Sequence, residues 1–261
     1  MKAVYMLALF LQIAGVARAQ GIVDGIGIEQ RLNESVPLDL VFRDETGAQV
    51  RLGDYFGKKP VILSLVYLKC PMLCTLVLNG LVRSLRATSF DAGREFEVIT
   101  VSFDPRETTE RAATMKRVYM EEYRRPGAEQ GWHFLTGDEA SIARLTEAVG
   151  FRYKYDPESG QFAHASGIMV LTPKGRIAQY FYGLEYSARD LRLSLVESAE
   201  NKIGSPVDQV LLYCFRYDPA KGKYGLVIMK ALRVAGVGTV LGLAIVILSL
   251  VYRQRRNEQA S

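Results

Sequence analysis

The segment Tyr67–Leu81, Y-L-K-C-P-M-L-C-T-L-V-L-N-G-L, holds two of the three cysteines of the 261-residue chain, Cys70 and Cys74. A nearly continuous apolar run, Val61–Leu68, leads into the pair. Such a run is typical of a strand in a sheet that is covered on both faces. After the pair, apolar residues recur at helical spacing, at Leu76, Val77, Leu81, Val82 and Leu85. The segment therefore predicts a buried strand, a loop that carries both cysteines, and a helix.

The rest of the central region continues the alternation of strands and helices. A hairpin is expected from Leu38–Phe42 and Val50–Leu52, around the turn D-E-T-G. Further strands are expected at Phe96–Phe103, Gly167–Leu171 and Arg176–Tyr182, and helices from Asp104 to about Arg125, over about Asp138–Val149 and from Ser187 to about Ala199. This order predicts an α/β fold, a thioredoxin-like sandwich with an added N-terminal hairpin.

The helix expected from Asp104 to about Arg125 has a start signal in its first residues, D-P-R-E. Asp104 is expected at the N-cap, Pro105 at the first helical position, and Glu107 as the residue that closes a capping box. The helix is expected to stop before Pro126, because proline cannot continue it.

The amino-terminal residues 1–19 have the pattern of a secretory signal peptide. Lys2 is followed by a largely apolar run from Val4 to Val16, and then by Ala17-Arg18-Ala19. A small-x-small sequence at this place predicts cleavage before Gln20. An uncleaved membrane anchor is the alternative.

The carboxyl-terminal run Val234–Tyr252 is uncharged. As a helix it would extend about 28 Å, close to the hydrocarbon thickness of a bilayer. Lys230 and Arg233 precede it and a basic tail, residues 253–261, follows it. We expect a transmembrane segment, with residues 20–222 as a periplasmic domain and the tail in the cytoplasm of a bacterium. The chain is thus expected to cross the inner membrane once.

The formal charge of +5 comes from the two ends of the chain. Residues 20–219 contain 24 basic and 27 acidic side chains and show no basic stripe. This balance argues against nucleic-acid binding.

Cys70 and Cys74 are expected near a helix N-terminus, where the helix dipole and free amides stabilise thiolates. A low-pKa dithiol outside the cytoplasm can exchange disulfides or hold a soft metal ion. A purely structural disulfide is a third interpretation, although closing so small a loop stabilises a fold little. The spacing alone leaves redox chemistry and metal binding open.

The chain has only two histidines and one further cysteine. His133, in G-W-H-F-L-T-G, is interpreted as part of a packed strand edge. His164, in Q-F-A-H-A-S-G, stands shortly before a predicted buried strand, where a lone histidine is more often structural. Cys214 is interpreted as a buried, inert cysteine, with a free thiol or an intermolecular partner as the alternatives.

Four motifs, in this order, resemble the Sco (SenC) family over about residues 30–200: Y-L-K-C-P-M-L-C, V-S-F-D-P-R-E-T-T, W-H-F-L-T-G and A-H-A-S-G-I-M-V-L-T-P-K-G-R. The resemblance implies a thioredoxin-like fold in which Cys70, Cys74 and His164 bind copper. It also implies a role in assembling the dinuclear copper centre (CuA) of cytochrome c oxidase, as a copper chaperone, a thiol reductase, or both.

The chemistry of the implied ligands agrees with copper. Two thiolates and one imidazole suit Cu(I), which prefers soft ligands, whereas structural zinc takes a fourth ligand. The leading hypothesis is a membrane-anchored copper chaperone whose partner is the copper-bearing subunit of the oxidase or another copper or thiol client. The alternative is a thiol–disulfide oxidoreductase with Cys70 and Cys74 as its redox pair. His164 separates the two, because disulfide exchange needs only the thiolates.

Overall fold

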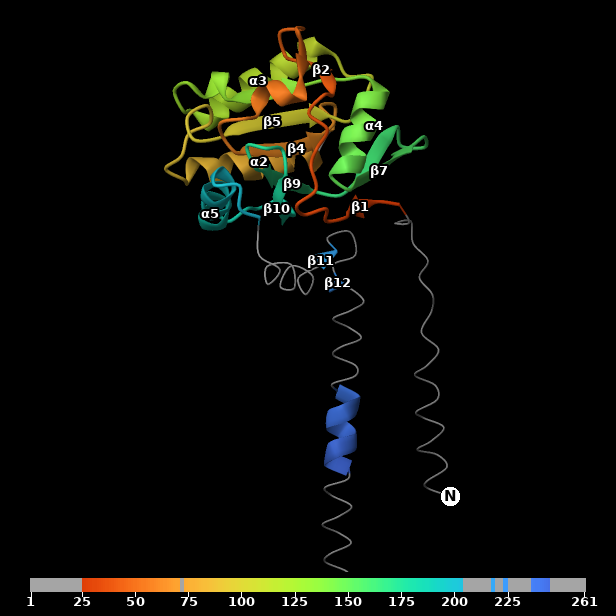
Figure 1. Ribbon diagram of the computed structural model, residues 1–261. Coiled ribbons are helices and arrows are strands. Elements are labelled where there is room, and N and C mark those ends of the chain that lie inside the picture. Colours follow the sequence, from red (N-terminus) through yellow and green to blue (C-terminus); the bar gives the residue numbers. More distant parts are fainter. Residues whose placement is uncertain (1–24, 71–72, 204–216, 219–222, 225–235, 245–261) are drawn as a thin grey trace, which may run out of the picture.

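The computed structural model describes residues 25–70, 73–203, 217–218, 223–224 and 236–244. Its strands are β1 (Gly27–Ile28), β2 (Val41–Arg43), β3 (Gln49–Arg51), β4 (Val61–Val66), β5 (Glu97–Ser102), β6 (Trp132–Leu135), β7 (Phe151–Asp156), β8 (Gln161–His164), β9 (Gly167–Leu171), β10 (Ile177–Tyr182), β11 (Tyr217–Asp218) and β12 (Lys223–Tyr224). Its helices are α2 (Leu73–Arg86), α3 (Thr109–Tyr123), α4 (Glu139–Ala148) and α5 (Ala188–Ala199), with short 3-10 turns η2 (Leu52–Tyr55) and η3 (Ala128–Gln130) (Figure 1).

The strand that precedes the cysteines, β4, lies at the centre of a five-stranded sheet of order β10-β9-β4-β5-β6. Strands β4, β5 and β6 are parallel, whereas β9 runs antiparallel to β4. Every residue of β4 is buried, as its continuous apolar sequence predicts. The expected buried strand is confirmed, and it ends at Val66 rather than at Leu68.

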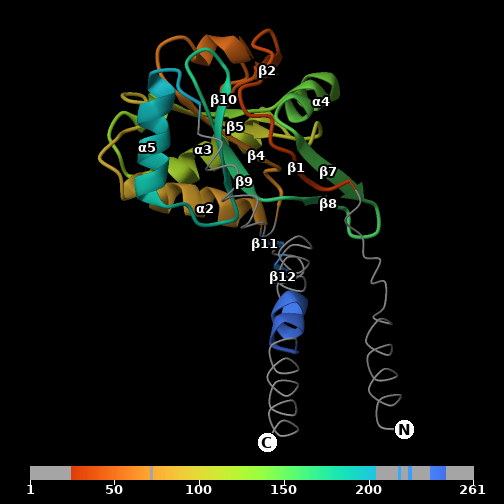
Figure 2. The ribbon, with the colours of Figure 1, turned by 60° about the horizontal axis from the view of Figure 1, so that its bottom comes forward.

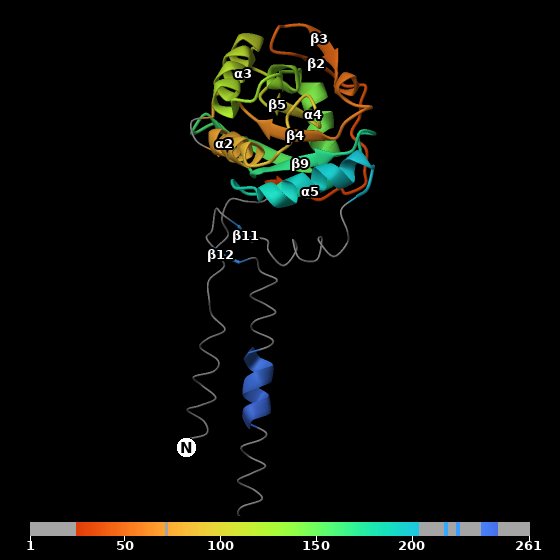
Figure 3. The same ribbon diagram turned by 90° about the vertical axis from the view of Figure 1, so that its left-hand side faces the viewer.

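Helices α2 and α3 connect the three parallel strands in sequence. Right-handed crossovers place both of them on the same face of the sheet. Helix α2 packs against both α3 and α5, and Figure 2 shows these three helices on one side of the sheet and α4 on the other. Figure 3 shows α5 running beside β9. The first turn of α2 is therefore held at the carboxyl edge of the sheet, next to the end of β4.

A second, three-stranded sheet has the order β1-β7-β8. Strands β7 and β8 form an antiparallel hairpin in which Tyr153 pairs with His164, and sequence analysis did not predict it. The hairpin ends at His164, three residues before β9 begins at Gly167. A separate two-stranded hairpin joins β2 and β3, with Val41 opposite Arg51.

The core of the five-stranded sheet contains the only tryptophan of the chain. Trp132 is fully buried and stacks on Phe134 and Tyr119. Its indole N–H donates to Thr100 Oγ1 at 3.0 Å, and Ser64 Oγ lies 2.9 Å from the same oxygen. The polar groups inside this sheet are thus hydrogen-bonded to one another, as buried polar groups are in stable cores.

The predicted start of α3 is wrong. The helix begins at Thr109, and the Thr108 side chain accepts a hydrogen bond from the Arg111 backbone N–H as its N-cap. Asp104 instead accepts from the backbone N–H of Arg106, and the Glu107 N–H bonds the Asp104 carbonyl, so that these residues form a turn. Local turn bonds of this kind compete with helix initiation at an aspartate. By contrast, the expected helix starts near Asp138 and Ser187 are confirmed, and each of these side chains accepts a hydrogen bond from the backbone N–H three residues later as an N-cap.

The predicted signal peptide, residues 1–19, and the tail, residues 253–261, lie outside the described residues, as does Cys214. Of the predicted transmembrane segment, residues 236–244 are described, and they are helical. No helix within the described ranges combines the length and apolar character that crossing a bilayer requires.

Candidate metal centre

The two cysteines lie on either side of the junction between β4 and α2. After β4 ends, the Cys70 backbone N–H donates to the Tyr67 carbonyl at 3.1 Å and closes a turn. Cys74 follows in the first turn of α2, and its backbone N–H donates to Cys70 Sγ at 3.3 Å. Amides in the first turn of a helix have no partner within the helix, so the Cys70 sulfur satisfies one of them. Both sulfurs therefore lie at the positive end of the helix dipole.

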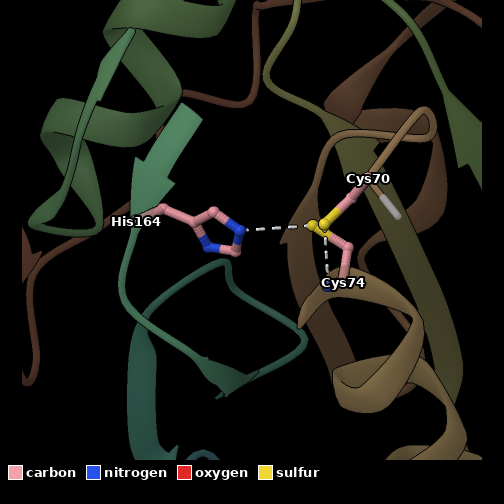
Figure 4. A group of neighbouring side chains, drawn as sticks. All are labelled: Cys70, Cys74 and His164. Carbon is pink, nitrogen blue, oxygen red and sulfur yellow. Dashed lines mark hydrogen bonds between the residues drawn. The ribbon is translucent and has the colours of Figure 1, made fainter. Parts of the chain in front are cut away.

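His164 approaches the cysteines from β8, and its Nε2 lies 3.3 Å from Cys74 Sγ (Figure 4). The other ring nitrogen, Nδ1, lies 2.8 Å from the Ala165 carbonyl oxygen. A carbonyl oxygen can only accept, so Nδ1 carries the proton and the Nε2 lone pair is directed at the sulfur. A backbone carbonyl that fixes the ring in this way is the usual partner of a metal-binding histidine.

The three donor atoms, Cys70 Sγ, Cys74 Sγ and a ring nitrogen of His164, all lie within 4.8 Å of one another. In the part of the chain that the structure describes, this is the one group of three or more histidine, cysteine or carboxylate side chains close enough to share an ion. All three residues that sequence analysis selected are thus together. Two sulfurs and one imidazole form a donor set for a soft metal ion.

Burial separates the two thiols. Cys74 is 3% exposed, whereas Cys70 is half-buried. Burial raises the pKa of the Cys74 thiol, and the N–H that Tyr67 donates to its sulfur at 3.3 Å does not offset this. This direction is opposite to the low thiol pKa expected at a helix N-terminus, and burial is its largest cause. In the metal-free protein its S–H can donate to the Nε2 lone pair, and metal binding would release that proton.

Aromatic rings enclose the imidazole of His164. Its ring centroid is 5.2 Å from that of Phe103 and 5.9 Å from that of Tyr67, both in edge-on contacts. Phe162, from the same strand, packs against both of these rings. This apolar surround limits the access of water and holds the ring in one orientation.

A buried carboxylate fixes the loop that carries Cys70. Glu107 Oε1 accepts the Lys69 backbone N–H at 2.9 Å, and the Glu107 side chain is fully buried. Burial raises the pKa of Glu107 despite that hydrogen bond. Arg111 Nε lies 3.7 Å from its other oxygen. Sequence analysis interpreted this glutamate as part of a helix cap, so its contact with the loop was missed.

A second carboxylate connects the start of α3 to the hairpin that carries His164. Asp104 is 2% exposed, and the Arg106 guanidinium donates to its two oxygens at 2.7 and 2.9 Å. Burial works to raise the pKa of Asp104, but the bonds from Arg106 bring it below its ordinary value. The same guanidinium lies over the rings of Tyr155 and Phe162, 4.9 and 5.4 Å from their centroids.

His133 is not part of the centre. It lies on β6, at the edge of the five-stranded sheet, where its ring packs on Tyr55 with centroids 4.2 Å apart. Its Nε2 is 3.6 Å from a Glu97 carboxylate oxygen. The interpretation of His133 as part of a packed strand edge is confirmed.

The family model described as SCO1/SenC matches residues 29–198 of the chain. Among solved structures, a proposed electron transfer protein from Aquifex aeolicus VF5 is 28% identical, with a TM-score of 0.57 over 66% of this chain and 95% of that one. A proposed electron transport protein from the same organism is 27% identical, with a TM-score of 0.54 over 66% and 99% of the two chains. Bradyrhizobium japonicum ScoI with copper bound is 25% identical, with a TM-score of 0.50 over 63% and 99%. Among curated proteins, none matches the chain significantly.

Proposed function

The chain belongs to the SCO1/SenC family, and from this membership and its Cys70–Cys74–His164 group we propose that it binds Cu(I) and serves in assembling the copper centre of cytochrome c oxidase. The convergence of the three donor atoms within 4.8 Å carries the proposal. The solved relative from Bradyrhizobium japonicum, which contains copper, supports it.

The donor set favours Cu(I) over the commoner zinc ion. Thiolate sulfur is a soft ligand that selects Cu(I), and structural zinc takes four protein ligands. Within the described residues the group has three members. The Ala165 carbonyl accepts from Nδ1 of His164, which leaves Nε2 as the ring nitrogen that faces the cysteines. Copper would be the cargo of this site, and the half-buried Cys70 is the ligand through which a client could approach.

One observation favours the second candidate function, a thiol–disulfide oxidoreductase. The sulfurs of Cys70 and Cys74 lie within 4.8 Å of each other, and Cys70 is more exposed than Cys74. Joining their sulfurs in a disulfide releases two electrons and two protons, and these would reduce a disulfide of a client to two thiols. His164 has no necessary part in that exchange, so its contact with Cys74 favours the copper function.

We further propose where the protein acts and which partner it serves. Residues 1–19 would be a signal peptide, residues 20–222 a periplasmic thioredoxin-like domain, and residues 234–252 a single span of the bacterial inner membrane, followed by the cytoplasmic tail 253–261. The apolar character of both segments and the basic residues beside the second support this arrangement. The partner would be the oxidase subunit that bears the CuA centre.

The test is an anaerobic titration of the full chain, in detergent, against a chromophoric Cu(I) chelator. The wild-type protein should take one Cu(I) from the chelator, and Cys70→Ser and Cys74→Ser should take almost none, because each loses a thiolate. Thr75→Ala, an exposed neighbour in the same helix, is the matched control and should bind like the wild type. Copper binding that survives both serine substitutions would sink the proposal.

A further inference from the structure

Glu107 is joined to the loop that carries Cys70 by a directed hydrogen bond. The Lys69 backbone N–H donates to Glu107 Oε1 at 2.9 Å, although 38 residues separate the two in the chain. Lys69 directly precedes Cys70. Glu107 lies between β5 and α3, where its own backbone N–H donates to the Asp104 carbonyl at 3.1 Å. The bond therefore connects the residue before a proposed ligand to a hydrogen-bonded turn in another segment.

The burial of Glu107 has a cost in free energy. Its side chain has 0% of its surface exposed, and Arg111 Nε lies 3.7 Å from Oε2. Among the residues that the structure describes, Oε2 has no hydrogen-bond partner. A buried carboxylate with an unpaired oxygen is unfavourable, and an apolar side chain of the same length would avoid that cost. What the carboxylate provides, and an apolar side chain would not, is the acceptor for Lys69.

The position of the Cys70 sulfur depends on this loop. The Cys70 backbone N–H donates to the Tyr67 carbonyl at 3.1 Å within the loop, and the Cys70 sulfur accepts the Cys74 backbone N–H at 3.3 Å. That amide is in the first turn of α2, where it has no partner within the helix, so its bond reports where the Cys70 sulfur lies. Cys70 is half-buried whereas Cys74 is buried, so packing fixes Cys70 less and the loop must hold it.

We propose that Glu107 is a positioning residue: by accepting the Lys69 N–H, it holds the Cys70 sulfur against the first turn of α2, within reach of the other two ligands. For copper binding this rests on the proposed function. For the arrangement of the two cysteines it stands alone, because the bond from Lys69 needs no metal ion. The role belongs to the acceptor oxygen rather than to the charge, since a backbone N–H can be held by any well-placed acceptor.

Two substitutions of similar volume separate the acceptor from the charge. Glu107→Met and Glu107→Gln both remove the charge, and only glutamine keeps a carbonyl oxygen that can accept from Lys69. Both avoid the cavity that a small side chain would leave at this buried position. Thermal unfolding followed by Trp132 fluorescence verifies that the two variants fold.

The first arm measures the exchange of individual backbone amides by NMR, in the reduced, metal-free and isotopically labelled full chain in detergent. In Glu107→Met the Lys69 and Cys74 amides should both exchange about tenfold faster than in the wild type, the ratio that corresponds to one lost hydrogen bond. Glu107→Gln should stay within about threefold of the wild type at both amides. A wild-type rate at the Cys74 amide in Glu107→Met would overturn the proposal, because the Cys70 sulfur would then keep its place without the carboxylate.

The matched control is Glu45→Met, which removes a similar bond elsewhere in the fold. Glu45 Oε2 accepts the Phe134 backbone N–H at 3.0 Å, and its carboxylate pairs with Lys116. Its side chain is 12% exposed, and the amide that it holds is on β6, at the edge of the five-stranded sheet. Glu45→Met should speed exchange at Phe134 and leave the Lys69 and Cys74 amides unchanged. Equal acceleration of these two amides by Glu45→Met and Glu107→Met would overturn the proposal, since general loosening would explain it.

The second arm is the Cu(I) competition titration on the same proteins. Glu107→Met should bind Cu(I) about tenfold more weakly than the wild type, Glu107→Gln within about threefold of it, and Glu45→Met equally well. Equal weakening in the methionine and glutamine variants of Glu107 would overturn the proposal, because the charge and not the acceptor would then matter. Unchanged Cu(I) affinity in Glu107→Met, beside faster amide exchange, would overturn it for copper. If the wild-type protein binds no Cu(I), the proposed function fails, and the metal-free arm still decides the role of Glu107.

Discussion

His164 Nε2 lies 3.3 Å from Cys74 Sγ, although 90 residues separate His164 from Cys74 in the chain. The order of the strands explains the contact. Strand β9 is the antiparallel neighbour of β4, with Ser64 opposite Ile168. The end of β4 is therefore beside the start of β9, and the residues that follow β4 meet the residues that precede β9. Cys70 and Cys74 belong to the first set and His164 to the second.

The contact predicts the effect of removing the imidazole. His164→Ala should weaken Cu(I) binding by more than about 100-fold, because loss of an outer partner of a ligand already costs about 10- to 100-fold. The Cys70–Cys74 disulfide should still form in this variant, because both sulfurs remain. The Cu(I) competition titration measures the first effect and thiol counting measures the second.

His133→Ala is the control for this experiment, because its ring packs on Tyr55 outside the centre. It should bind Cu(I) like the wild type. Wild-type copper affinity in His164→Ala would remove the histidine from the site. Loss of thiol reactivity at unchanged copper affinity would instead assign it to redox chemistry and favour the oxidoreductase.

The unequal burial of the thiols predicts the order in which they react. Cys70 should be alkylated before Cys74 in the reduced, metal-free protein, because Cys74 is 3% exposed and its burial raises the pKa of its thiol. Time-resolved alkylation, followed by mass spectrometry of the peptide from Cys70 to Arg83, measures both rates. Prior loading with Cu(I) should protect both thiols. Equal rates at the two positions, or faster reaction at Cys74, would show that burial does not control access.

The elements around the cysteines could be predicted from sequence because their signals are local. A continuous apolar run predicted the buried strand, and two helices were expected to start near Asp138 and Ser187, where α4 and α5 begin. The convergence of Cys70, Cys74 and His164 was implied by family resemblance alone. It depends on the pairing of β4 with β9, and no pattern within either strand specifies its neighbour.

The misses have different origins. Asp104 and Glu107 match a capping box, but Asp104 bonds Arg106 within a local turn and Glu107 bonds the Lys69 backbone in another segment. The β7–β8 hairpin does have a local signal, the turn residues P-E-S-G at positions 157–160. Its strands are amphipathic and belong to a small separate sheet, so they lack the long apolar run that marked the central strands.

A glycine in α2 offers a test of how closely that helix is packed. A Cβ atom at Gly80 would lie 1.9 Å from the Leu184 carbonyl oxygen. Gly80→Ala should therefore lower the free energy of unfolding by about 1–3 kcal/mol, although alanine in an open helix would raise it by about 1 kcal/mol. Chemical unfolding followed by the fluorescence of the buried Trp132 measures the change.

The exposed Arg83, on the same helix, is the control for Gly80. Arg83→Ala should change the free energy of unfolding by less than about 0.5 kcal/mol. A stabilised Gly80→Ala protein would show that α2 and the segment around Leu184 can separate without cost.

The pair formed by Asp104 and Arg106 predicts a dependence of stability on pH. The pKa of Asp104 is lowered in the folded protein, because the bonds from Arg106 outweigh its burial. A carboxylate of this kind contributes stability above its unfolded pKa of about 3.9, and the contribution is lost as the pH falls through the lower folded pKa. Asp104→Asn should thus reduce the free energy of unfolding by about 1–2 kcal/mol at about pH 7, and by less at about pH 3.

The control is Asp39→Asn, because the Asp39 side chain is 70% exposed in its pair with Arg144. It should have little effect at either pH, as exposed ion pairs contribute little. Urea unfolding at the two pH values measures the differences. An Asp104→Asn difference that is the same at both values would mean that the carboxylate stays protonated or unpaired in the folded protein.

The proposed membrane arrangement predicts the outcome of reporter fusions. A reporter that is active only outside the cytoplasm should be active when fused at about Gly222 and inactive when fused after Ser261, because a cleaved signal followed by one apolar span places these positions on opposite sides. A reporter that is active only in the cytoplasm should give the reverse result and is the control for expression.

Lys230 and Arg233 precede the span and oppose this orientation, so the signal peptide must determine it. Deleting residues 1–19 should therefore abolish the external activity at Gly222. External activity after Ser261 would contradict both the orientation and the single span.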